Sequence, residues 1–232
     1  MLNMTEIKFI DKGIIDYQAA WDFQKELFDK VLNSKKADPV ISKEKREGFF
    51  VFCEHPHVYT LGKSGSENNL LINQMQLKAK NATFYKIDRG GDITYHGPGQ
   101  IVGYPIIDLE LLGISVKGYV NLIEETIIQT LKEFSISSER LEGATGVWLD
   151  TETPKARKIC AIGVRVSRYI TMHGFAFNIN TNLDYFNNIN PCGFTDKSVT
   201  SLQKELGSKQ DIEKVKEVLK SKFAEVFGIS LS

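Results

Sequence analysis

Residues 89–100 bring together more chemically active side-chain types than any other stretch of the sequence. The run reads Arg-Gly-Gly-Asp-Ile-Thr-Tyr-His-Gly-Pro-Gly-Gln, and its four glycines and one proline allow the backbone to approach a ligand closely. Arg89 adds a fixed positive charge and His96 a titratable ring. An ordinary turn between strands would also explain the glycines, but this mixture of polar side chains favours a binding loop.

The sequence contains no recognisable nucleotide or metal motif. A G-x-G-x-x-G fingerprint is absent, and Gly62-Lys63-Ser64 has His57 where a phosphate loop requires its first glycine. The spacings of the cysteines match no zinc site, and no metal spacing links the histidines. We therefore expect no metal and no cofactor.

The three cysteines stand in different contexts. Cys192 lies between a proline and a glycine, which indicates a turn with an accessible backbone. Cys53 ends an apolar run and is typical of a small buried residue, whereas Cys160 lies mid-strand, in the core or in a pocket wall. A loop thiol acts as a nucleophile only as a thiolate, which requires a nearby positive charge or base. The alternative is that Cys192 is an incidental loop cysteine.

Lys158 is the candidate partner for such a thiolate. It opens an otherwise apolar strand, so its ammonium group is placed to turn toward a pocket. A solvated lysine at a strand end is the alternative. His173 lies on another strand in which Phe175 and Phe177 share a face, and that face suits either an apolar ligand or the core.

The elements that must position these residues follow from hydrophobic periodicity. Asp16 precedes the first helix as a cap, Gly228 ends the last one, and Pro105 should confine part of its strand to an edge or a bulge. Strands and helices mix without strict alternation, which predicts an α+β fold with a mixed or antiparallel sheet flanked by helices. We expect helices at 17–32, 119–134 and 211–227, and strands at 49–53, 84–87, 101–109, 146–149, 158–166 and 169–178, the last two joined as a hairpin at 167–168.

Composition narrows the class of protein. The chain has 232 residues, with 29 basic and 29 acidic side chains, and this balance argues against a general nucleic-acid binder. No apolar run approaches a membrane span, no secretion signal begins the sequence, and an odd number of cysteines is typical of a reducing cytoplasm. We expect a single domain over 1–232; the alternative is that the last ~30 residues form a small appended unit.

Separated segments of the chain together resemble the lipoyl(octanoyl) transferase family, which is related in fold to the lipoate and biotin protein ligases. The glycine-rich loop combined with the separate lysine and cysteine segments makes this resemblance specific. It spans most of the chain and is carried by residues 54–62, 89–100, 102–105, 146–148, 158–166, 173–178, 191–193 and 199–202.

The resemblance implies a ligase-like catalytic domain that transfers an octanoyl group from octanoyl-acyl carrier protein to a specific lysine of a lipoyl domain. This is the first step of endogenous lipoate biosynthesis, and it needs no cofactor, nucleic acid or membrane. The implied acceptors are the lipoyl domains of 2-oxoacid dehydrogenase E2 subunits and the glycine cleavage H protein. Cys192 would be the acyl-accepting nucleophile and Lys158 its charge partner. The implied substrate contacts are Arg89, Gly90, Gly91, Asp92, Ile93, Thr94, Tyr95, His96, Ala161, Ile162, Gly163, Gly174, Phe175 and Ala176.

Three alternatives remain open on the sequence. An ATP-dependent lipoate-protein ligase of the same fold would leave the Cys192–Lys158 pair without a role. A lipoyl-domain amidotransferase would move octanoate between two lipoyl domains. A non-catalytic acyl-binding or lipoyl-domain-binding module would not depend on Cys192. Because acyl carrier proteins are acidic, an enzyme of this kind should also carry a local basic face, for which the candidates are Lys155, Arg157, Arg165 and Arg168.

Overall fold

The computed structural model describes residues 6–37, 47–190 and 198–232. Cys53 and Cys160 lie within these ranges as free thiols, and both are buried. The candidate nucleophile Cys192 lies outside the described residues, so its expected turn is not tested.

The described residues form a large mixed sheet with the strand order β12-β1-β2-β6-β10-β9-β8-β7, to which β11 adds beside β9. The pairs of β1 with β12, β1 with β2, and β11 with β9 are parallel, and the other pairs are antiparallel. The strands are β1 Glu6–Ile14, β2 Phe49–Glu54, β6 Gln100–Ile106, β7 Glu139–Leu141, β8 Ala144–Leu149, β9 Arg157–Ser167, β10 Ile170–Asn178, β11 Ser198–Val199 and β12 Ser230–Leu231.

A second, smaller sheet has the order β4-β3-β5. Its strands are β3 Val58–Leu61, β4 Thr83–Lys86 and β5 Ile93–His96. The helices are α1 Tyr17–Ala37, α2 Gln74–Ala79, α3 Leu109–Leu112, α4 Val116–Glu133, α5 Leu202–Leu206 and α6 Ile212–Phe227, with 3₁₀ turns η2 Glu67–Asn69 and η3 Leu183–Asn188. None of the helices in the described ranges is both long enough and apolar enough to cross a membrane.

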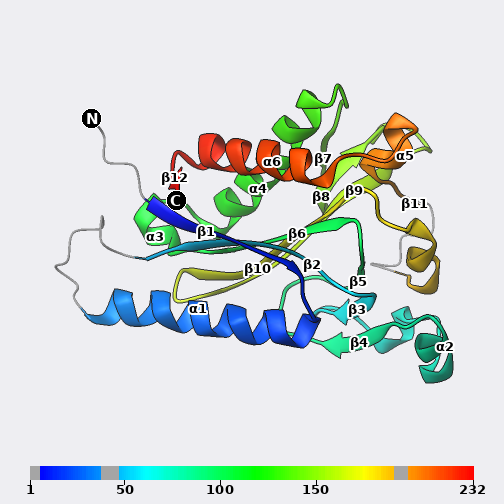
Figure 1. Cartoon of the computed structure of the whole chain (residues 1–232), viewed down its shortest axis with the longest axis horizontal. Helices are drawn as coiled ribbons and strands as arrows, with labels where there is room; N and C mark the ends of the chain where they lie inside the picture. The colour runs from blue at the N-terminus through cyan, green and yellow to red at the C-terminus, as the bar shows by residue number, and fades with distance from the viewer. Residues whose placement is uncertain (1–5, 38–46, 191–197) are drawn as a thin grey trace.

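Helices cover both faces of the large sheet (Figure 1). Helix α1 lies along one face, and α4 and α6 lie side by side on the other. The small sheet lies beyond one end of α1, next to α2. This arrangement confirms the expected α+β fold.

The apolar run of β2 shows why helices cover both faces of the large sheet. Phe50 and Phe52 point toward α6, whereas Phe49, Val51 and Cys53 point toward α1. Successive side chains of a strand alternate between faces, so a continuous apolar run must be buried on both. The sequence therefore specifies a central strand here.

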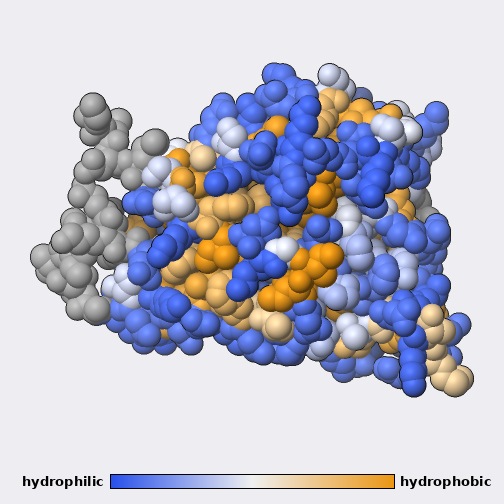
Figure 2. Space-filling model, viewed as in Figure 1, coloured by the Kyte–Doolittle hydropathy of each residue, from blue (hydrophilic) through white to orange (hydrophobic). Residues whose placement is uncertain are grey.

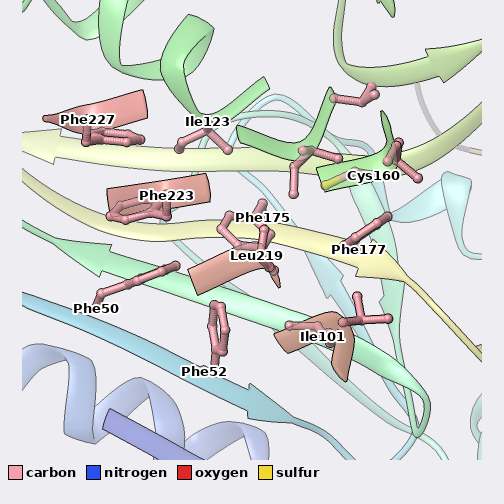
Figure 3. Close-up of a cluster of buried hydrophobic side chains, with 14 of the residues drawn as sticks. Phe50, Phe52, Ile101, Ile123, Cys160, Phe175, Phe177, Leu219, Phe223 and Phe227 are labelled. Carbon is pink, nitrogen blue, oxygen red and sulfur yellow. The ribbon is translucent and has the colours of Figure 1, made fainter. Parts of the chain in front are cut away.

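The core beneath α4 and α6 is rich in aromatic rings (Figure 3). Phe223 of α6 stacks on Phe50 with ring centroids 3.9 Å apart and on Phe227 at 4.1 Å. Helix α6 thus contributes to the main core and packs directly on the sheet.

The three expected helices are confirmed, and their ends are set by the residues that the sequence indicated. The Asp16 carboxylate accepts hydrogen bonds from the backbone N–H groups of Gln18 and Ala19, and Gly228 ends α6 in the left-handed conformation at φ +64°. The hairpin between β9 and β10 turns at Arg168 and Tyr169, one residue later than expected. Strand β1 was not expected.

The expectation that Pro105 demotes part of its strand to an edge is confirmed locally, although β6 as a whole is a central strand. Pro105 lies opposite Phe50 in β6, between β2 and β10. The pairing of β6 with β10 extends only as far as Gly103, so no β10 partner requires an N–H group at Pro105. On that side the hydroxyl of Thr171 donates to the Pro105 carbonyl at 2.7 Å instead.

The face shown in Figure 2 is mostly hydrophilic, with apolar areas between the helices and an apolar projection beside the small sheet. This projection lies at the lower right, where Figure 1 places α2. The large apolar side chains exposed in this region are Leu71 and Met75.

Candidate active site

A cavity of about 620 Å³ opens between the large sheet and the glycine-rich segment that precedes β5. Strands β6, β9 and β10 supply one wall, and β5 with the preceding residues supplies the opposite wall. The candidate residues that line it are Arg89, Gly90, Gly91, Asp92, Ile93, Thr94, His96, Lys158, Ala161, Ile162, Gly163, Gly174, Phe175 and Ala176. The sequence therefore located one connected pocket from segments far apart in the chain.

Small residues form the sheet side of this pocket. Ala161 pairs with Ala176, and Gly163 pairs with Gly174, across the antiparallel ladder of β9 and β10. The lack of large side chains leaves space for a ligand above the strands. At Gly163 that space is narrow, because a Cβ atom there would lie 3.0 Å from Arg89 Cδ.

A break in the register of β9 decides which of its side chains face the pocket. Val147 pairs with Cys160, but the next residue of β8, Trp148, pairs with Lys158, so β9 holds one extra residue at Ile159. Ile159 and Cys160 consequently both enter the main core, although they are consecutive. The bulge therefore places Lys158 and Ala161 on the pocket side together, which a regular strand would not do.

Cys192 lies in sequence between two described parts of the chain, and the second of these, at Ser198 and Val199, lines the pocket. On its N-terminal side, the backbone N–H of Asn190 donates to Asn69 at 2.9 Å. On its C-terminal side, Val199 of β11 pairs directly with Lys158, and the Thr200 N–H donates to the Lys158 carbonyl at 2.9 Å. Residues 198–200, which follow the segment that contains Cys192, thus lie against the backbone of the candidate lysine.

Arg89 is buried and fixes the glycine-rich segment in place. Its Nη2 donates to the carbonyl oxygen of Thr60 at 2.7 Å and to the Thr60 hydroxyl at 3.0 Å. Its Nη1 donates to the Gly90 carbonyl, while the Gly90 N–H donates to Val164 of β9 at 2.9 Å. The segment is therefore tied to both sheets. It is also not a loop throughout, since residues 93–96 form β5.

Two histidines line the pocket, and burial favours the neutral form of both. His96 is hydrogen-bonded to Gln100 at 2.9 Å, and burial lowers its pKa well below the usual value, with the charge of Arg89 acting in the same direction. His173 donates from Nε2 to Asp88 at 2.9 Å, and burial lowers its pKa although Asp88 opposes the shift. His173 has φ +60°, an unusual conformation for a residue other than glycine.

Some expected site residues direct their side chains elsewhere. Tyr95 is buried in the small sheet, where its ring stacks on Tyr185 with centroids 4.9 Å apart. The ring of Phe175 and the side chain of Ile162 pack with the main core, so these residues border the cavity without filling it. Cys160 also lies in that core and not in the pocket wall (Figure 3).

Burial makes the two described thiols poor nucleophiles. It raises the pKa of both Cys53 and Cys160 far above the usual range, so neither forms a thiolate near neutral pH. The expected burial of Cys53 in the core is confirmed.

Other pocket residues were not found from the sequence. Tyr17 at the start of α1 lines the cavity and stacks on His96 at 5.9 Å, and Trp148 lines it beside Lys158. Helical periodicity marked Tyr17 only as an apolar position, and no local signal links it to residues 79 positions away. The sequence indicated Trp148 only as part of the segment 146–148, one of those that carry the family resemblance, and not as a pocket residue.

Two of the four candidates for a basic face are engaged in ion pairs. Arg157 pairs with Glu205 at 2.7 Å and also with Asp150. Arg165 pairs with Asp88 at 2.8 Å. These acidic partners neutralise much of the charge that an acidic protein would encounter.

Comparison with known proteins agrees with this site. Residues 16–224 match the model of the lipoyl protein ligase A/B catalytic domain, a range that contains the pocket, Lys158 and Cys192. The chain belongs to this family. Within the family it is 54% identical to the octanoyltransferase of Christiangramia forsetii, covering 97% of each chain, and 56% identical to that of Flavobacterium psychrophilum, covering 99% of this chain and 100% of the relative. The protein is accordingly an acyltransferase.

Solved structures of lipoate protein ligases share the fold of this family member. The bi-partite lipoate protein ligase of Thermoplasma acidophilum has a TM-score of 0.70 at 12% identity, over 98% of this chain and 86% of that chain. A lipoate-protein ligase A bound with ATP has a TM-score of 0.69 at 12% identity, over 99% of this chain and 87% of that chain. The ligase-like fold expected from the sequence is therefore confirmed.

Proposed function

We propose that the protein transfers an octanoyl group from octanoyl-acyl carrier protein to a specific lysine of a lipoyl domain, through a thioester on Cys192. The observation that carries the proposal is the position of Lys158. It faces the pocket at one end of a floor of small residues, and the chain that follows Cys192 pairs with its backbone. Relatives named octanoyltransferase, 54% and 56% identical over nearly the whole chain, support the choice of acyl group.

In the first step, the Cys192 thiolate attacks the carbonyl carbon of the octanoyl thioester. The bond from that carbon to the phosphopantetheine sulfur breaks, and the leaving thiolate takes a proton from the Lys158 ammonium. The products are the S-octanoyl enzyme, a free carrier thiol and a neutral Lys158 amine. The ammonium stabilises the cysteine thiolate before the attack.

In the second step, neutral Lys158 removes a proton from the ammonium of the acceptor lysine. The resulting amine attacks the octanoyl thioester, the Cys192 thiolate leaves, and an amide bond forms as the attacking nitrogen releases its second proton to solvent. Lys158 is again charged and Cys192 again ionised, so the cycle closes. A thioester already carries the energy needed to form an amide, and the reaction needs no ATP or other cofactor.

Burial of the acyl chain would provide most of the binding energy for this group. Eight carbons include seven methylene or methyl groups, which gives an upper bound of roughly 5–6 kcal/mol. Ala161, Gly163, Gly174 and Ala176 leave room for the chain along the strands. His96 and His173 add no charge to this part of the pocket, because burial favours their neutral forms.

We further propose lipoyl domains of 2-oxoacid dehydrogenase E2 subunits and the glycine cleavage H protein as acceptors. The reaction would be the first step of endogenous lipoate biosynthesis, in the cytoplasm, where free thiols such as those of Cys53 and Cys160 stay reduced. The single domain over 1–232 would bind donor and acceptor in turn.

Intact-mass measurement after incubation with octanoyl-acyl carrier protein, without ATP, tests the proposal. The wild-type protein should gain about 126 Da, the mass of one octanoyl group in thioester linkage, and Cys192→Ser should not. Cys160→Ala and Cys53→Ala are matched controls that should retain the adduct. An adduct of equal yield on Cys192→Ser would overturn the assignment. A strict requirement for ATP would favour the lipoate ligase alternative.

A further inference from the structure

Strand β8 contacts the ammonium group of Lys158 through two groups of its own. The Lys158 Nζ donates to the Thr145 carbonyl at 3.0 Å and lies 4.6 Å from the centroid of the Trp148 ring. Trp148 is the residue that pairs with Lys158 across the bulge. A carbonyl oxygen and the face of an indole ring both attract a positive charge.

The indole ring is fixed in this position. Trp148 is buried, and its Nε1 donates to the Ala144 carbonyl at 2.8 Å within the same strand. The ring therefore presents a constant face to the ammonium group, as a cation–π contact requires.

Gly146 allows the lysine stem to lie across the strand. Its φ of +124° is a conformation that other residues rarely adopt, and a Cβ atom would come 3.3 Å from Lys158 Cε and 2.5 Å from the Cys160 carbonyl. The Gly146 N–H donates to the buried carboxylate of Glu124 at 3.0 Å, which ties β8 to α4. The backbone on which the lysine rests is thus held from the opposite face of the sheet.

We propose that Trp148 is a positioning residue that keeps the Lys158 ammonium charged and aimed into the pocket, with Gly146 providing the space for its stem. The inference rests on the proposed role of Lys158 and extends it. It gives residues 146–148 a part in the chemistry, because a charged Lys158 is needed to stabilise the thiolate and to protonate the leaving group. If Trp148 is only a wall of the pocket, its loss should weaken substrate binding and leave the chemical step intact.

Steady-state kinetics of Trp148→Leu separate these two roles. Loss of the ring should lower kcat about 2- to 30-fold, leave KM nearly unchanged, and move the alkaline limb of the pH–rate profile to lower pH. Trp148→Phe should restore part of kcat, because it keeps an aromatic face. The matched control is Phe23→Leu, which removes the contact of Lys12 with the Phe23 ring at 4.2 Å, away from the pocket, and should retain wild-type kinetics.

Fluorinated tryptophan provides a second test that preserves the shape of the site. The chain has two tryptophans, so a Trp21→Phe background leaves Trp148 as the single labelled position. Fluorine withdraws electrons from the ring face and weakens its attraction for a cation. We expect kcat to fall stepwise with the number of fluorine atoms, even if Trp148→Leu does not fold.

Lys158→Met distinguishes failure of this inference from failure of the proposed function. Full activity of Lys158→Met would overturn the proposed function and the inference with it. An inactive Lys158→Met together with unchanged kcat and pH profile in the Trp148 variants would overturn the role of Trp148 alone. So would a raised KM at constant kcat, since that result marks a pocket wall.

Discussion

Burial, more than any charged neighbour, sets the protonation of the histidines around the pocket. His55 donates from Nδ1 to the Ile15 carbonyl at 2.8 Å and bonds through Nε2 to the Tyr104 hydroxyl at 2.7 Å. Both contacts suit a neutral ring, and burial lowers its pKa to about 4. The same cause acts on His96 and His173. The histidines of the pocket are therefore neutral at physiological pH, and they do not supply charge to the chemistry that we assign to Lys158.

The lowered pKa of His55 predicts a loss of stability in acid. In the unfolded chain an ordinary histidine takes up a proton near pH 6.5, whereas folded His55 does so only near pH 4. The unfolded state thus binds more protons between these values, and the free energy of unfolding falls as the pH drops through this window, by at most about 3 kcal/mol. Stability is full above about pH 6.5.

His55→Asn should remove this contribution, because an amide can keep the contact with Ile15 without titrating. Urea unfolding at pH 7.5 and pH 4.5 should show a smaller difference for the variant than for the wild-type protein. An equal difference in both proteins would mean that other groups, such as carboxylates, account for the whole acid sensitivity.

The helices show how much of an element follows from sequence alone. Apolar positions at helical spacing indicated α1, α4 and α6, and Asp16 and Gly228 marked two of their ends, because these signals are local. The bulge at Ile159 carries no such signal. The bulge is defined by the pairing of β9 with β8. Because the sequence does not show this pairing, it cannot show that Lys158 and Ala161 share a face. The candidate residues could thus be named from their motifs, while their orientation depended on contacts across the sheet.

The close contact between Gly163 of β9 and Arg89 predicts that this part of the pocket tolerates no added side-chain volume. Gly163→Ala would place a methyl group 3.0 Å from Arg89 Cδ and 3.1 Å from the Gly90 carbonyl, and hydrogen bonds to Thr60 hold the arginine in place. Overpacking of this kind typically costs about 1–3 kcal/mol, so we expect kcat/KM with an octanoyl donor to fall about 5- to 100-fold. A shorter acyl chain should lose less. Kinetics with hexanoyl and octanoyl carriers measure both effects.

Gly118→Ala is the matched control for that substitution. Gly118 lies in α4, where a Cβ atom would make only ordinary contacts, the nearest at 3.4 Å. This variant should keep its activity and gain roughly 0.4–1 kcal/mol of stability, because alanine loses less backbone freedom on folding. Wild-type kinetics for Gly163→Ala would show that the floor of the pocket is wider than the structure indicates.

At the scale of the whole molecule, the pocket is built from helices and strands that lie far apart in the sequence. The sheet side comes from β6, β9 and β10, the other side from residues next to β5, and Tyr17 comes from α1. Strand β1 pairs with β12 at the other end of the chain, and α6 closes the core behind β10. The site is therefore assembled only when the chain folds as one unit.

Phe223→Ala tests this dependence, because the residue joins α6 to the sheet far from the pocket. Its ring is fully buried between Phe50 and Phe227, and removal of such a side chain typically costs about 3–5 kcal/mol. We expect one cooperative thermal transition at a lower Tm, with octanoyl transfer lost over the same temperature range. Leu206→Ala, at a more exposed position on α5, should change stability by less than about 0.5 kcal/mol. Two separate transitions, with activity surviving the first, would show that α6 folds apart from the catalytic core.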